Sequence, residues 1–62
     1  SVLFFSEVID EIKLLSIEGK ILHYQLLKAN RYEIPNHVDE GLYFIEMIEQ
    51  GNIKTAKFLY VK

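Results

Sequence analysis

The stretch that most constrains the fold runs from residue 3 to residue 17 and reads LFFSEVIDEIKLLSI. At about 100° per residue, most of its large apolar side chains fall on one side of a helix. They are Phe4, Phe5, Val8, Ile9, Ile12 and Leu15. Gly19 follows shortly after, and glycine is typical of the position beyond a helix end because it adopts left-handed backbone angles. The stretch therefore predicts an amphipathic helix over residues 3–17.

Residues 37–50 show a second pattern with helical spacing. Asn36 stands where a capping residue would accept hydrogen bonds from free amides, and Asp39 follows three residues later, as in a capping box. Gly51 is in position to end the segment. The apolar stripe of this segment consists of Val38, Leu42, Ile45 and Ile48. We expect a second helix here, with Ile45 on its core side.

Two further segments, residues 20–30 and 52–62, are compatible with either helix or strand. The first is rich in residues that favour helix, yet Leu22, Tyr24 and Leu26 also alternate as they would in a strand. The second could be capped by Asn52, whereas residues 58–61 are typical of a strand. A single long helix through Gly19 is also possible, because a seven-residue apolar repeat continues across that glycine.

Together these segments predict an all-α fold in a single small domain covering residues 1–62. The expected architecture is three to four short helices arranged as two helical hairpins. The alternative is an α+β fold, with a small sheet formed from residues 20–34, from residues 53–61, or from both.

Short pieces of the chain resemble known families. Residues 51–56, together with Tyr60, are similar to the turn and second helix of a tetratricopeptide unit, and residues 26–30 resemble part of an ankyrin repeat. These resemblances imply a helical hairpin in general. Residues 18–21 and 44–47 are similar to the C-terminal tail of medium-chain reductases, which implies a detached enzyme fragment as one possible origin. No catalytic role is carried over to any residue.

Composition limits the classes of function. The chain has 62 residues, half of them apolar, and no cysteine, so it has neither disulfides nor thiolate zinc sites. Nine acidic residues and seven scattered basic ones give a net charge of −2. Because nucleic-acid binding needs a concentrated basic field, we expect no nucleic-acid partner. No apolar run approaches the roughly 20 residues that span a bilayer, so we expect a cytoplasmic protein without membrane contact.

The sequence contains no pattern typical of a catalytic or metal site. His23 and His37 have no regular ligand spacing, and a zinc site would need carboxylates from elsewhere to join them. The chain has no nucleophile elbow and no glycine-rich phosphate loop. We therefore expect no enzyme activity, no cofactor and no metal ion.

Several apolar residues lie off the predicted core stripes. They are Leu14 and Ile17 in the first predicted helix, and Tyr43 and Met47 in the second. A chain of this size has a marginal core, so a second chain covering these residues would stabilise it. We predict a small protein-protein interaction module, such as a dimerisation domain, adaptor or inhibitor, with a protein partner or a homo-oligomer bound at these four residues. The alternatives are a small transcriptional or nucleic-acid regulator, and the detached enzyme fragment.

Overall fold

The computed structural model describes residues 1–62 and contains four antiparallel strands and no helix. The strands are β1 (Val2–Leu15), β2 (Ile21–Glu33), β3 (Gly41–Glu49) and β4 (Asn52–Tyr60). Strands make up 73% of the chain, so the predicted all-α fold and its helical character are wrong. The α+β alternative correctly expected strands within residues 20–34 and 53–61, but it kept helices that the structure lacks.

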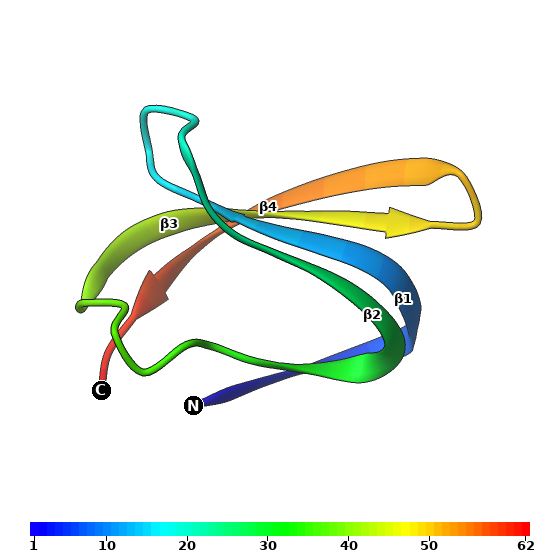
Figure 1. Ribbon diagram of the computed structural model, residues 1–62, viewed down its shortest axis with the longest axis horizontal. Coiled ribbons are helices and arrows are strands. Elements are labelled where there is room, and N and C mark those ends of the chain that lie inside the picture. Colours follow the sequence, from blue (N-terminus) through cyan, green and yellow to red (C-terminus); the bar gives the residue numbers. More distant parts are fainter.

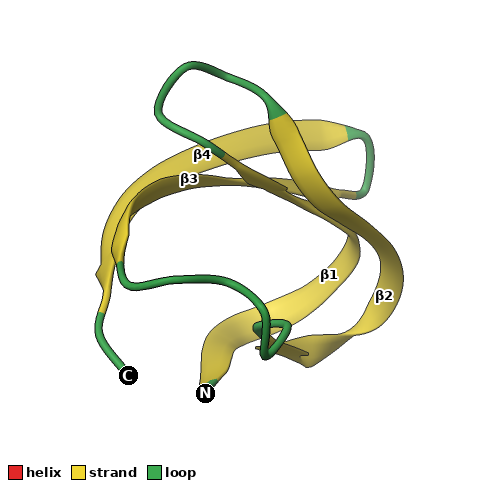
Figure 2. Ribbon diagram, turned by 60° about the vertical axis from the view of Figure 1, so that its left-hand side comes forward, coloured by secondary structure: helices red, strands yellow, loops and turns green.

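The four strands form one sheet in the order β2-β1-β3-β4. Two hairpins, β1–β2 and β3–β4, meet where β1 pairs with β3. Figures 1 and 2 show that the sheet is strongly curved, and that the connection from β2 to β3 passes across its hollow side. Both chain ends lie at the same end of the molecule (Figure 1).

The burial pattern in the second half of β1 shows why residues 3–17, the first predicted helix, form a strand for most of their length. Ile12 and Leu14 are fully buried, whereas Lys13 and Leu15 between and beside them are only partly covered. This alternation has the period of two that one-sided strands require. The helical spacing came from Ile9 and Ile12, which are both buried although three residues apart. The β1–β2 pairing is irregular on both sides of Ile9, where β1 bends, so the alternation of faces does not extend unbroken from Ile12 back to Ile9.

The second predicted helix is also a strand over most of its length. In β3, Ile45 is buried, and its alternate neighbours Tyr43 and Met47 pack against the core from the same face. The expectation that Ile45 belongs to the core is therefore confirmed. Asn36 caps no helix, because it lies in a turn in which the Val38 amide donates to the Pro35 carbonyl at 3.1 Å.

The glycine after β3 ends a strand rather than a helix. Gln50 and Gly51 both have positive φ, at 49° and 79°, and Glu49 pairs directly with Asn52 across the turn. Two central residues with positive φ define the type I′ turn, whose twist matches that of an antiparallel hairpin. The β3–β4 pairing that follows has no irregularity over its nine residue pairs.

The β1–β2 hairpin is less regular. Phe4 pairs with Arg31 and Ile9 with Ala29, so β1 has three more residues than β2 between these two pairs. Farther along, Lys28 takes a positive φ of 53° at a second register shift. Irregularities of this kind bend strands, and both strands turn sharply in this region (Figure 1).

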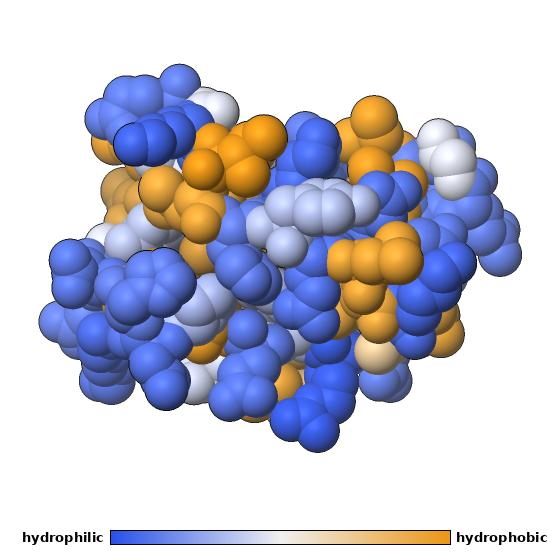
Figure 3. Space-filling view, viewed as in Figure 1, coloured by the Kyte–Doolittle hydropathy of each residue, from blue (hydrophilic) through white to orange (hydrophobic).

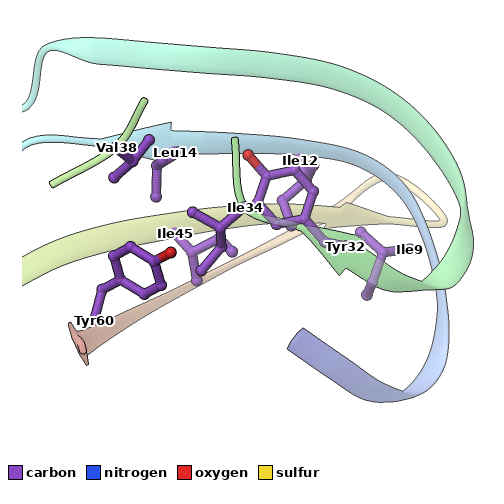
Figure 4. Close-up of a cluster of buried hydrophobic side chains, with 8 residues drawn as sticks. All are labelled: Ile9, Ile12, Leu14, Tyr32, Ile34, Val38, Ile45 and Tyr60. Atoms are coloured by element: carbon purple, nitrogen blue, oxygen red, sulfur yellow. The ribbon is translucent and has the colours of Figure 1, made fainter. Parts of the chain in front are cut away.

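The core lies on the hollow side of the curved sheet and draws on all four strands and the β2–β3 connection (Figure 4). It consists of Ile9, Ile12, Leu14, Tyr32, Ile34, Val38, Ile45 and Tyr60. Ile34 and Val38 belong to the connection, which therefore closes the hollow side as a lid of the core. The accessible surface of 4232 Å² matches the ~4,200 Å² expected for a folded monomer of this mass. The chain is thus normally compact, yet it buries only eight residues.

Candidate protein-interaction surface

Side chains that point away from the core form what we call the outer face of the sheet. Residues directly opposite in paired strands share a face, and successive residues alternate between faces. The strand register then assigns the outer face to Glu11, Lys13, Leu15, Ile21, Tyr24, Leu26, Leu42, Phe44, Glu46, Ile48, Ile53, Thr55, Lys57 and Leu59. Eight of these 14 side chains are aliphatic or phenylalanine, which is unusual for a face that no other layer covers.

One row of four residues, three of them apolar, crosses all four strands near the β3–β4 turn. Leu26 pairs with Glu11, Glu11 with Ile48, and Ile48 with Ile53. Leu26 and Ile53, at the two ends of this row, are 61% and 64% exposed. They lie on the two edge strands of the sheet, with Glu11 and Ile48 between them. Together with the other apolar side chains of the outer face, they make this face a candidate contact surface.

The next row is polar. Lys13 pairs with Glu46 across the β1–β3 seam, and their side-chain atoms Nζ and Oε1 lie 3.5 Å apart. The Tyr24 hydroxyl donates to Oε1 of Glu11 at 2.5 Å. This hydrogen bond to a carboxylate raises the pKa of Tyr24, because ionisation of the phenol would remove the donated proton and place two negative charges together.

Beyond the polar row, the outer face is apolar again. Leu15 pairs with Phe44 at the centre, and Ile21 lies beside Leu15 on β2. Leu42 and Leu59 pair with each other at the end of the β3–β4 hairpin and are 48% and 65% exposed. In the space-filling view, apolar residues reach the visible surface in separate patches between hydrophilic ones (Figure 3).

The structure separates the four residues predicted to form the interface. Leu14 is fully buried, and Tyr43 and Met47 pack against the core from the inner face. The Tyr43 hydroxyl donates to the Asp39 carbonyl at 2.6 Å. Only Ile17 is exposed, at 56%, in the turn between β1 and β2. Three of the four thus serve the interior of this chain, and whether any of them contacts a partner stays untested.

Sequence reasoning missed the residues of the outer face. Leu42 and Ile48 were placed on a core stripe together with Ile45, although in a strand they point away from it. The signal that could have found them is the alternation of two apolar sets in residues 42–48, one for each face of a strand.

A second feature is a shallow cavity of ≈ 600 Å³ that runs along β2 and ends at Pro35, two residues after the strand. Alternate residues from His23 to Pro35 line it, and most of them are polar. The His23 ring packs beside Tyr32, with Nδ1 2.8 Å from the Tyr32 hydroxyl oxygen. Burial raises the pKa of Tyr32 to about 12 because the phenolate would lose its hydration.

Charged side chains also gather at the β3–β4 turn. Glu49 lies beside Glu7 of β1, and a hydrogen bond and charge repulsion between the two carboxyls raise the pKa of Glu7. Nζ of Lys54 lies 3.5 Å from Oε1 of Glu49, and the positive charge of Lys54 lowers the pKa of Glu7, which partly offsets the increase. The Gln50 amide donates to Asp10 at 3.0 Å, which ties β1 to the turn. These contacts connect the ends of the two hairpins.

The structure has no group of three or more histidine, cysteine, aspartate or glutamate side chains placed to hold a metal ion. His23 and His37 lie apart, the first beside Tyr32 and the second in the β2–β3 connection. No helix in the structure has the length and apolar character needed to cross a membrane.

The outer face is therefore the feature of this molecule that ordinary folding requirements explain least. Its aliphatic side chains surround a central ion pair and contribute little to the core on the opposite side of the sheet. In comparisons with known proteins, no family model, no curated protein and no solved structure matches the chain.

Proposed function

We propose that this chain is a protein-protein interaction module that binds another protein surface through the outer face of its sheet. The observation that carries the proposal is the exposure of Leu26 and Ile53, at 61% and 64%, in a row shared by all four strands. Fully burying one such side chain stabilises by about 1.5 to 3 kcal/mol relative to leaving it exposed. A partner covering this row would therefore gain substantial binding free energy.

The curvature of the sheet also supports a protein surface as the ligand. The inner face is already occupied by the core and by the β2–β3 connection, whereas no segment of the chain crosses the outer face (Figure 2). Small-molecule sites are usually concave pockets, and an outward-facing sheet offers none. Broad, weakly featured apolar surfaces are instead typical of protein interfaces.

The other functions considered from the sequence have less support. On the outer face, Lys13 and Lys57 are offset by Glu11 and Glu46, so this surface lacks the concentrated positive charge that phosphate binding requires. Nothing in the fold favours an enzyme fragment over an interaction module. A cytoplasmic location and the lack of enzyme activity stay predictions.

The test is a double substitution, Leu26→Lys with Ile53→Lys. Both residues are exposed, so the fold should persist, while two charges would lie where a partner is expected to exclude water. The matched control is Asn30→Lys with Asn36→Lys, which adds the same charge at exposed positions outside the outer face. The immobilised chains would be compared for capture of proteins from source-cell extract and of the soluble wild-type chain.

We expect the outer-face variant to lose at least about tenfold in capture, since charges placed in a desolvated contact are costly. The control should capture as the wild type does, and all three chains should give the same strand-dominated circular dichroism spectrum. If the outer-face variant captures the same proteins to the same extent as the wild type, the proposal is wrong.

A further inference from the structure

We propose that the free edge of β4 binds an extended, acidic segment of another protein, which adds to the sheet as a fifth strand. This site is the backbone edge of the sheet and is separate from the apolar contact proposed for the outer face. Three observations carry the proposal: β4 is a regular strand with one open side, its outward backbone groups have no partner, and its one charge without a counter-charge is positive.

The two edges of the sheet differ in regularity. In the order β2-β1-β3-β4, the edge strands are β2 and β4. Register shifts interrupt the β1–β2 pairing, and Lys28 of β2 has a positive φ, so β2 is bent. The β3–β4 pairing has no such shift, and β3 is the only strand that β4 contacts. Because bulges protect an edge against further pairing, β4 is the edge that can accept another strand.

The turn determines which peptide groups of β4 point outward. Glu49 and Asn52 flank a two-residue turn, so they exchange both of their backbone hydrogen bonds. Such pairs alternate along an antiparallel ladder, so Lys54, Ala56 and Phe58 also bond to β3. The amides and carbonyls of the residues between them point away from β3; these residues are Ile53, Thr55, Lys57 and Leu59. No backbone hydrogen bond outside the strand ladders and no side-chain hydrogen bond involves any of these four residues.

An added strand would use these free backbone groups and extend the outer face by one row of side chains. Main-chain hydrogen bonds supply the affinity in this mode of binding, and the side chains opposite the edge strand supply the specificity. In antiparallel pairing, residues of the added strand would lie opposite Ile53 and Leu59, which are 64% and 65% exposed. Apolar residues at these two positions would cover both side chains.

The charges of β4 select an acidic segment. Lys54 and Lys57 are its charged residues, and it contains no acidic residue. Nζ of Lys54 lies 3.5 Å from Oε1 of Glu49, whereas Lys57 forms no ion pair and lies on the outer face. A carboxylate opposite Lys57 in the added strand would supply the missing counter-charge, because opposite charges directly across a strand pair are stabilising.

The same lysine disfavours a second copy of β4 as the added strand. If two copies paired in antiparallel along their full length, Ala56 would face Ala56, and Lys57 would face Thr55. The two Lys57 side chains would then be diagonal neighbours on one face, about 7 to 8 Å apart, with no carboxylate in either strand. Lysine on an edge strand acts against such self-pairing. The occupant that fits is therefore a segment of another protein, with apolar residues opposite Ile53 and Leu59 and a carboxylate opposite Lys57.

The test uses two synthetic seven-residue peptides with blocked ends. The first has valine at its first and last positions, glutamate at its third position and threonine elsewhere, so that in antiparallel pairing the glutamate lies opposite Lys57. The second peptide has lysine in place of the glutamate. Amide NMR signals of the labelled chain are followed during titration with each peptide. We expect the outward amides of β4 to shift more than those bonded to β3, and the glutamate peptide to bind at least about threefold more tightly than the lysine peptide.

Two variants separate the backbone contribution from the charge. Thr55→Pro removes an outward amide but no hydrogen bond to β3, and proline is tolerated on edge strands, so this chain should keep its strand spectrum and bind both peptides at least about tenfold more weakly. Lys57→Glu should reverse the preference between the peptides, whereas its control Lys20→Glu, in the turn between β1 and β2, should keep the wild-type preference. If Thr55→Pro does not fold, the comparison of these two charge variants still decides.

Three results would overturn the proposal. They are equal affinities of the wild-type chain for the two peptides, shifts that spare the outward amides of β4, and the absence of any shift at millimolar peptide concentration. Concentration-dependent shifts of the outward amides in the chain alone would identify a second copy as the added strand and would overturn the acidic segment.

Discussion

At the scale of single residues, the backbone of Lys28 is under strain. Its φ of 53° lies in the left-handed region, which costs an L-residue other than glycine about 1 to 2 kcal/mol. This conformation accommodates one extra residue in β2: between the pairs Ile9–Ala29 and Glu11–Leu26, β2 has two residues where β1 has one. The strain is therefore a local consequence of the bend that wraps the hairpin around the core.

Replacement of this residue tests the strain. Lys28→Gly should raise the free energy of unfolding by about 0.5 to 1 kcal/mol, because glycine adopts positive φ without a steric penalty. Lys57→Gly is the control, since Lys57 is also exposed in a strand but has an ordinary φ. The control should lose a similar amount. Urea unfolding followed by circular dichroism measures both, and a destabilised Lys28→Gly chain would contradict the assigned backbone conformation.

Tyr32 makes the stability depend on alkaline pH. Burial raises the pKa of Tyr32 to about 12 in the folded chain, whereas the unfolded chain loses this proton near pH 10. Between these values the folded state binds more protons than the unfolded state, so the free energy of unfolding falls as the pH rises. The hydrogen bond from Tyr24 to Glu11 acts in the same direction, since it also raises a tyrosine pKa.

We therefore expect the urea midpoint to decrease between about pH 10 and pH 12, and Tyr32→Phe to weaken that decrease. Tyr32→Phe should also be less stable near neutral pH, because His23 loses the hydroxyl that lies 2.8 Å from its Nδ1. A midpoint that decreases equally in both chains would show that Tyr32 is not the buried group responsible.

At the scale of secondary-structure elements, the β3–β4 hairpin depends on its two-residue turn. Gly51 has φ of 79° and no heavy atom within 4 Å of the position of a Cβ. Gly51→Ala should therefore destabilise the chain through backbone strain alone, by about 1 to 2 kcal/mol. Gln50→Asn should instead stabilise it, because asparagine tolerates positive φ better. Thermal melts of the two variants give the comparison, and equal melting temperatures would argue against a type I′ turn.

The strands could be predicted from the sequence only in part. Residues 20–34 and 53–61 were correctly considered as possible strands from the alternation of Leu22, Tyr24 and Leu26 and from the β-rich end of the chain. The first half was misassigned because Ile9 and Ile12 are both buried at a helical spacing, where β1 bends and its pairing with β2 is irregular on both sides of Ile9. Nothing in the local sequence marks this irregularity, which depends on pairing with β2.

The misassignment of β3 has a different cause, and it bears on the candidate site. Residues 42–48 are apolar on both faces, so they match the helical template as well as the strand template. A strand with a polar outer face would have shown a clear alternation. The property that obscured the fold in the sequence, an apolar outer face, is thus the one from which we infer the interaction surface.

At the scale of the whole molecule, the fold rests on a small core without disulfides. Only eight of the 62 residues are buried, and domains of this size are marginally stable on their own. The expectation of self-association followed from the same size argument and from the apolar fraction, neither of which depends on the fold class. The position of the interface did depend on it, and Leu14, Tyr43 and Met47 were selected from helical wheels that do not apply.

A dilution series followed by methyl NMR tests the central claim, that the outer face is the surface at which this chain meets a protein partner. Association should shift the methyl signals of Leu26, Ile48 and Ile53 progressively between low and high micromolar concentration. The signals of Ile12 and Ile45, which are buried on the inner face, should stay in place. Concentration-dependent shifts confined to the outer-face methyls are the predicted result. Shifts confined to the chain ends or the inner face, with Leu26 and Ile53 unchanged, would contradict the account.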